Sequence, residues 1–149
     1  MCCPPGTVQK YLNKISGPLL DRIDIHVEVT PVSYNELAGK RLSEKSSSVR
    51  ERVIQTRKIQ DQRYQNNEEV HCNAQMSSKQ LRDICQIDEE GNQLLKTAME
   101  KLGLSARAYD RILKVARTIA DLDENEKIEA NHLAEAIQYR SLDREGWAG

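Results

Sequence analysis

Two arginines occupy positions where a cationic side chain could do chemistry. Arg22 follows Leu19-Leu20-Asp21 at an elbow between a helical spacing and the alternating pattern of residues 23–29, so its long side chain could reach out of its own fold. Arg107 lies in the first turn after Ser105, a good helix N-cap. Its cation and the free N–H groups of that helix start converge on one spot, which suits an anion.

Each arginine also has a purely structural interpretation. Arg22 could be a cation that interacts with the dipole at the C-terminus of its helix. The adjacent Asp21 need not pair with it, because neighbouring helical residues do not face one another. Arg107 could be a solvated residue, although the N-terminal end of a helix is the less favourable place for a cation. Arg111, one turn further on, is the second candidate for the role of Arg107.

The stretch from Lys40 to Tyr64 is strongly basic. It carries eight cations against three acids, a net charge of +5 in a chain whose formal net charge is −1. Most of it is predicted to be a helix from Val49 to about Tyr64, opened by the capping-box pattern Ser48-x-x-Glu51. The thin apolar face of this helix is typical of a solvated or bridging helix, while its charge would also suit contact with a DNA backbone. The candidates for that contact are Arg50, Arg52, Arg57 and Lys58.

Several kinds of site are absent from the sequence. No GxxxxGK[ST] motif occurs, so no phosphate-binding P-loop is encoded here. Asp123-Glu124 could be taken for a Walker B motif, but the apolar run before it has a helical period. The three histidines are scattered, and the four cysteines form no CxxC pair, so free thiols are expected. No apolar run approaches the roughly 18 residues of a membrane helix, and the N-terminus lacks a signal-peptide core, which favours a cytoplasmic protein without membrane contact.

The alternation of residues 23–29 predicts a strand with one buried face. A lone strand cannot satisfy its own hydrogen-bonding groups, and no second strong strand follows. We therefore expect this strand to belong to a sheet encoded upstream, or else to pair with another copy of the chain. A helix whose pattern is broken at Gly17-Pro18 and that gives way at Asp21-Arg22 is expected before the strand, and a short helix from Tyr34 to about Ala38 after it.

From residue 77 on, the spacing predicts a small helical bundle. The expected helices follow Ser77, run from about Asp88 to Gly103, follow Ser105, and run from Ala130 to about Tyr139. The helix after Ser105 has the most regular apolar face, with residues at i, i+3, i+4 and i+7 over four turns. With 30% charged and only 4% aromatic residues, the composition also favours helices with thin apolar stripes.

Two segments, SGPLLDRIDIHVEV and GLSARAYDRILKVARTIADL, resemble the magnesium-chelatase-like AAA+ ATPases, and within them the ComM (YifB) branch. The resemblance extends over roughly residues 8–140. It implies a mainly α chain, in which a helical AAA+ lid bundle is preceded by the last helix and strand of an α/β ATPase core. The predicted division is the end of that core over residues 1–32, a polar linker with a long basic helix over 33–76, and the lid over 77–149.

The resemblance also implies roles for the arginines. In the segment matching LLDR, Arg22, preceded by Asp21, would be the arginine finger that reaches the γ-phosphate bound by a neighbouring subunit. Arg107, with Arg111 as the alternative, would be the sensor 2 residue that contacts the nucleotide of its own subunit. ATP and Mg²⁺ would bind to the full-length parent, in a ring of identical subunits expected to be a hexamer. This fragment, lacking Walker A and B motifs, would bind no nucleotide tightly and be inactive alone.

Other functions stay open at this stage. The parent could be a DNA-remodelling motor of the ComM type, or a relative of the chelatase ATPase subunit that acts on a protein partner. The chain could instead be a non-enzymatic helical module that binds DNA or protein. A third interpretation is a zinc-dependent interaction domain. Cys2 and Cys3 would then be the end of a cysteine-rich zinc site located just upstream, as the ComM-type family often has.

Overall fold

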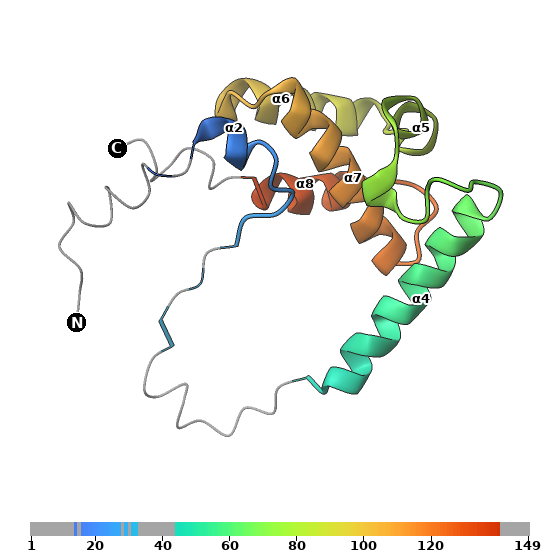
Figure 1. Cartoon of the computed structure of the whole chain (residues 1–149). Helices are drawn as coiled ribbons and strands as arrows, with labels where there is room; N and C mark the ends of the chain where they lie inside the picture. Colours follow the sequence, from blue (N-terminus) through green and yellow to red (C-terminus); the bar gives the residue numbers. More distant parts are fainter. Residues whose placement is uncertain (1–13, 15, 28, 30, 33–43, 141–149) are drawn as a thin grey trace.

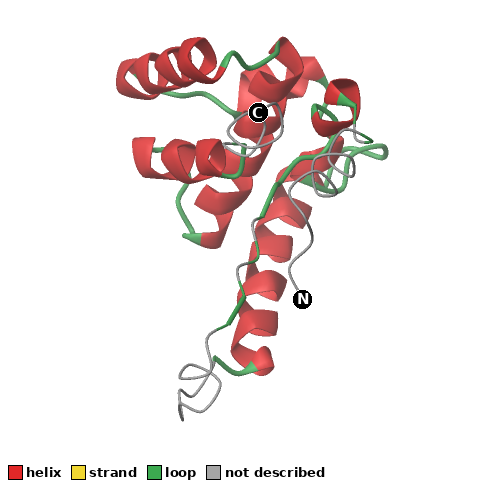
Figure 2. Ribbon diagram, turned by 90° about the vertical axis from the view of Figure 1, so that its left-hand side faces the viewer, coloured by secondary structure: helices red, strands yellow, loops and turns green. Residues whose placement is uncertain are grey.

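The computed structural model describes residues 14, 16–27, 29, 31–32 and 44–140, and these form helices joined by loops (Figures 1 and 2). No strand occurs among them, which confirms the prediction of a mainly α chain. The elements are α2 (Gly17–Leu20), α4 (Ser46–Tyr64), the 3₁₀ helix η1 (Asn73–Gln75), α5 (Ser78–Ile84), α6 (Glu89–Leu102), α7 (Ala106–Leu122) and α8 (Ala130–Gln138).

Helix α7 is the centre of the bundle. It contacts α8, α4, η1 and α5, while α6 packs on α8. Leu95 of α6, Ile112 of α7 and Leu133 of α8 are almost completely buried and join these helices in one core. The α6–α8 contact is close, because a Cβ added at Gly91 would lie 2.8 Å from Cδ1 of Leu133. A glycine is therefore needed at this point of α6.

The predicted helix boundaries of the bundle are confirmed by their caps. Ser77 and Gln80 form the expected capping box at the start of α5. Asp88 and Ser105 cap α6 and α7 with their side-chain oxygens. Gly103 follows α6 in the left-handed conformation, with φ 53°, which a residue without Cβ adopts readily. These local signals place α7 correctly, and α7 carries the candidates Arg107 and Arg111.

One predicted boundary is confirmed and one is wrong. Helix α2 ends at Leu20, directly before the predicted elbow at Asp21-Arg22, and Gly17-Pro18 lies at its start, where the missing N–H of proline is not needed. Helix α4 begins at Ser46 with Lys45 as its N-cap, and not at the predicted Ser48 cap. The Lys45 carbonyl already accepts the amide of Ser48 at 3.0 Å, so no side-chain cap is required there. The predicted helix from residue 34 to 38 lies outside the described residues.

The predicted strand over residues 23–29 is not formed in the described part of this chain, and its pairing with a strand outside the chain stays a prediction. Its apolar residues are exposed, with Ile25 46%, Val27 66% and Val29 87% accessible. The described residues offer no other strand that could take up its backbone groups. The amide of His26 instead donates to the Tyr139 carbonyl at 2.9 Å, which lays this segment against the end of α8.

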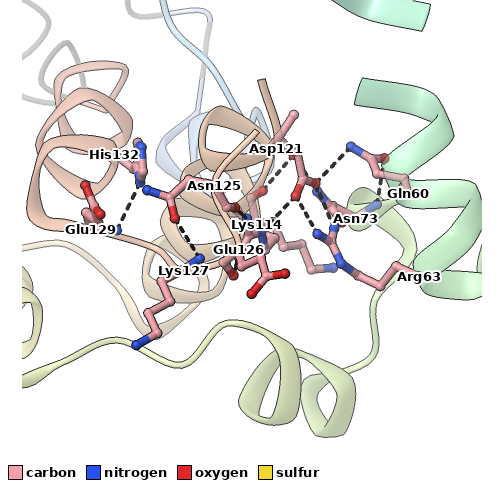
Figure 3. A network of polar contacts seen from close by, with 12 residues as sticks. Gln60, Arg63, Asn73, Lys114, Asp121, Asn125, Glu126, Lys127, Glu129 and His132 are labelled. Atoms are coloured by element: carbon pink, nitrogen blue, oxygen red, sulfur yellow. Dashed lines mark hydrogen bonds and ion pairs between the residues drawn. The ribbon is translucent and has the colours of Figure 1, made fainter. Parts of the chain in front are cut away.

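A buried carboxylate attaches α4 to the bundle (Figure 3). The side chain of Asp121 is fully buried near the end of α7. Arg63 of α4 donates to its two oxygens at 2.7 and 2.5 Å, and Arg117 of α7 donates to it at 3.1 Å. Asn73 of η1 and Gln60 of α4 complete the set at 2.7 and 3.4 Å. Two arginines and two amides thus compensate the desolvation of one carboxylate.

The same network extends in both directions from Asp121. Arg117 donates to the carbonyls of Asn125 and Glu126, which fixes the loop between α7 and α8. The hydroxyl of Tyr64 donates to Asn73 Oδ1 at 2.9 Å, and burial raises the pKa of Tyr64 to about 12, so this hydroxyl stays a donor at neutral pH. The hydrogen bond with Asp121 raises the pKa of Arg63 above its ordinary value.

Replacing the buried carboxylate should therefore be strongly destabilising. We expect Asp121→Ala to lower the free energy of unfolding by about 3–5 kcal/mol, because Arg63 and Arg117 would lose their buried counter-ion. Urea unfolding followed by circular dichroism measures this loss. Asp61→Ala is the matched control, because it removes an exposed carboxylate from α4 and should leave the unfolding midpoint unchanged. Equal effects of the two changes would contradict the role given to Asp121.

Burial should also protect one of the two cysteines in the described residues. Cys85 is 4% accessible and packs in the core, and desolvation raises the pKa of its thiol to about 12. The reactive species is the thiolate, so Cys85 should remain almost unreactive at pH 8, while the half-buried Cys72 is alkylated first. Iodoacetamide labelling read by peptide mass spectrometry tests this order. The difference should disappear in denaturant, and equal labelling of the folded chain would refute it.

Candidate functional site

The elbow that carries Arg22 is held against the bundle by ionic contacts on either side of it. Asp24, two residues after Arg22, pairs with Arg111 of α7. Before it, Asp21 Oδ1 lies 3.9 Å from Nη2 of Arg140, a residue that is 1% accessible. Arg140 Nη1 also donates to the Ile23 carbonyl. These contacts fix the backbone on both sides of Arg22.

Arg22 itself is exposed at this elbow. Helix α2 ends at Leu20, and the amide of Arg22 donates to the Leu19 carbonyl at 3.0 Å, so the chain turns at this point. The position agrees with the predicted geometry of a cation at a bend. Its proposed action on a phosphate stays a prediction.

Arg107 is exposed in the first turn of α7, directly after the Ser105 cap. The hydroxyl of Ser105 accepts the Ala108 amide at 3.2 Å, which fixes the start of the helix. Arg111 is one turn further along and is engaged by Asp24. Since Arg22 precedes Asp24 by two residues and Arg107 precedes Arg111 by one turn, both exposed arginines lie near this ion pair.

Two of the hollows that adjoin α7 lie near the candidate residues. One, of about 610 Å³, lies between α5 and the first half of α7, and Arg82, Asn92, Tyr109 and Asp110 contribute polar groups to its lining. The other, of about 420 Å³, is mostly apolar and lies between residues 24–27, α7 and the end of α8. The first has the size of a small-molecule site, and its lining includes Tyr109, two residues after Arg107.

The basic run on α4 divides into residues with different surroundings. Arg52 pairs with Glu44, and its Nη2 lies 3.1 Å from Glu44 Oε2. Arg63 belongs to the buried Asp121 network. The other candidates on the helix, Arg50, Arg57 and Lys58, are exposed.

Helical geometry separates these cations further. At 100° per residue, Arg50 and Arg57 lie about 20° apart around the axis, whereas Arg52 lies on the opposite side. The part of α4 from Ser46 to Gln55 contains no buried residue, and it extends away from the bundle in both views (Figures 1 and 2). Arg50 and Arg57 therefore share one side of α4, Lys58 lies about 80° from Arg50 around the axis, and of the four DNA-contact candidates Arg50 and Arg52 lie in the projecting part.

The sequence interpretation missed the buried polar residues. Asp121 opens the acidic stretch of residues 121–126, yet it lies inside α7 and is fully buried. Arg63 was counted among the surface cations. A usable signal was present in α7, where Arg117 and Asp121 stand four residues apart on the same side as Leu113 and Ala120. An opposite-charge pair on an apolar helix face indicates a buried ion pair.

The metal and membrane predictions concern residues both inside and outside the described part of the chain. Cys2 and Cys3 lie outside the described residues, so the zinc hypothesis that uses them stays a hypothesis. Within the described part of the chain, no group of three or more His, Cys, Asp or Glu residues could hold a metal ion. No helix in that part is long and apolar enough to cross a bilayer.

Comparison with known proteins gives two family matches in tandem. The family described as magnesium chelatase, subunit ChlI C-terminal, matches residues 43–140. The family described as magnesium chelatase, subunit ChlI, matches residues 1–37. The first match spans α4 to α8, and the second includes the elbow with Arg22.

Curated relatives agree with these matches. The chain is 43% identical to competence protein ComM of Haemophilus influenzae and 40% identical to the uncharacterized protein YifB of Escherichia coli, over 94% and 95% of its length. It is 33% identical to the uncharacterized protein Rv2897c of Mycobacterium tuberculosis over 93% of its length. In each case it spans 27% of the relative. The chain therefore belongs to the magnesium chelatase family, with the ChlI C-terminal domain as its helical bundle.

Proposed function

We propose that this chain is the lid and the adjoining core end of a magnesium-chelatase-like AAA+ ATPase, and that it supplies two arginines to ATP sites in a ring of identical subunits. The observation that carries this is the Asp24–Arg111 ion pair, because it holds the elbow of Arg22 beside α7, whose first turn contains Arg107. Each of these exposed guanidinium groups suits the charge of a triphosphate, and they would act on two different nucleotides.

The two arginines have different tasks in this proposal. Arg107, at the N-terminal end of α7, contacts the nucleotide of its own subunit together with the helix dipole. Arg22, on a turn that is fixed on both sides, reaches the nucleotide of the neighbour. Arg111, the alternative to Arg107, positions the elbow through Asp24. Asp21 contributes by its contact with Arg140.

ATP and Mg²⁺ are assigned to the longer protein. The exposed arginines fit phosphate groups, but the described residues contain no cluster that could hold a metal ion. The chain also carries no P-loop motif. We therefore place the phosphate-binding loop and the Mg²⁺ ligands outside this chain. The division into a core end over residues 1–32, a linker over 33–76 and a lid over 77–149 belongs to the same proposal.

A second proposed role is DNA binding by α4. Its support is the exposure of Arg50, Arg57 and Lys58 on α4, within about 100° of one another around the helix axis. Because lysine and arginine contacts to phosphates release counter-ions, such binding would depend strongly on salt and weakly on sequence. The name of one relative, competence protein ComM, does not mention DNA. The proposed DNA role therefore rests on the charges of α4 themselves.

Mutation of each arginine in the full-length protein should separate their roles. We expect Arg22→Ala to leave ATP binding nearly intact and to reduce hydrolysis steeply, since arginine fingers are worth about 10³–10⁵ in rate. Arg107→Ala should weaken ATP binding as well, because it removes a contact within the same subunit. Equilibrium nucleotide binding and steady-state phosphate release measure the two effects.

Mixed rings provide the decisive control. Subunits with Arg22→Ala, mixed with subunits whose P-loop is inactivated, should regain some activity, because an intact P-loop can face an intact Arg22. Subunits with Arg107→Ala should regain none in the same mixture, because the defect lies in the only subunits that bind ATP. Rescue of both variants, or of neither, would refute the assignment of roles.

The DNA role has a control built into the same helix. Replacing Arg50, Arg57 and Lys58 by Ala should weaken DNA binding of the full-length protein and reduce the slope of log K against log salt by about 0.9 for each lost duplex phosphate contact. Arg52→Ala removes the same charge from the opposite side, where Glu44 already engages it, and should have little effect. Fluorescence anisotropy over a salt series measures both. Equal effects per residue would indicate a diffuse charge effect and contradict a defined surface.

A further inference from the structure

Helix α7 connects the candidate nucleotide site with the basic helix. Arg107 lies in its first turn, and Asp121 lies near its other end, 14 residues further on. At 1.5 Å per residue, the two positions are about 21 Å apart along one uninterrupted helix. A displacement of the Arg107 end of α7 is therefore transmitted as a rigid movement to Asp121.

The attachment of α4 to α7 is unusually polar. The buried residues of α4 are Thr56, Gln60 and Tyr64. Of its aliphatic residues, Ile59 is half-buried, whereas Val49, Val53 and Ile54 are at least 40% accessible. Apolar packing alone would leave the direction of such a helix loosely defined. A two-pronged arginine–carboxylate contact has a fixed planar geometry, so the Arg63–Asp121 pair defines the direction of α4 relative to α7.

We propose that Asp121 is a positioning residue that couples the nucleotide site to the DNA-binding surface of α4. This inference rests on the proposed function, since it takes Arg107 as the nucleotide contact and the exposed cations of α4 as the DNA contact. Asp121 touches neither ligand. It acts through Arg63, Gln60 and Asn73, which hold α4 and η1 to the end of α7.

Coupling of this kind has a measurable signature that a merely structural residue lacks. If the nucleotide state moves α7, the affinity for DNA should differ between the ADP state and the state with a non-hydrolysable ATP analogue. Typical couplings between two sites change affinity by roughly 5–150-fold. The ratio of the two DNA affinities therefore reports the coupling, while each affinity alone reports whether α4 is intact.

The experiment compares Asp121→Asn with the unmodified full-length protein, using a fluorescein-labelled DNA duplex and anisotropy in both nucleotide states. We expect the variant to bring the affinity ratio to within about twofold of one, while DNA affinity in the ADP state changes by less than about threefold. The control Asp61→Asn makes the same chemical change at an exposed site of α4 and should keep the original ratio.

A second variant covers the risk that Asp121→Asn fails to fold. Arg63→Lys keeps the charge but loses the planar fork, at a side chain that is 20% accessible, and it should reduce the same ratio.

A ratio of DNA affinities that survives in both variants would overturn the inference, as would loss of DNA binding in both nucleotide states. An unmodified protein that binds the ATP analogue and DNA with a ratio of one would overturn the coupling but leave the proposed function standing. Failure to bind either ligand would instead refute the proposed function.

Discussion

The arrangement of this bundle depends on one desolvated carboxylate. Asp121 is inaccessible to water, and a bare carboxylate at that depth would cost several kcal/mol. Its compensation comes from four side chains on three elements, so α4, η1 and the end of α7 can only assemble in an arrangement that brings them together. Apolar packing makes the bundle compact, while this network determines where α4 lies.

A similar principle holds at the elbow of Arg22, with weaker and more exposed contacts. Asp24 and Arg111 are both partly accessible, and solvent screens such pairs. Arg140 is fully buried and holds the backbone at Ile23, so the elbow is fixed by one buried and one partly accessible arginine. Arginines thus serve two purposes in this chain. Those in contact with carboxylates or carbonyls organise the fold, and those left exposed at its ends are available to ligands.

Local signals in the sequence predicted the bundle well, because each depends on only a few neighbouring residues. The N-caps at Ser77, Asp88 and Ser105 and the glycine at 103 are examples. Residues whose role depends on contacts distant in sequence were not predicted. Arg63 and Asp121 are 58 residues apart, and nothing near either residue reveals the other. For the candidate site, the positions of Arg22 and Arg107 followed from the sequence, but the Asp24–Arg111 pair that relates them did not.

The predicted strand depends on distant contacts in the same way. Alternation of apolar and polar residues indicates which face would be buried, but a strand exists only where another strand accepts its backbone groups. Residues 23–29 have the alternation, and their apolar side chains are exposed where they are described. This segment also falls in a different family match, over residues 1–37, from the bundle that follows. We therefore propose that its apolar face pairs with a strand outside the described residues.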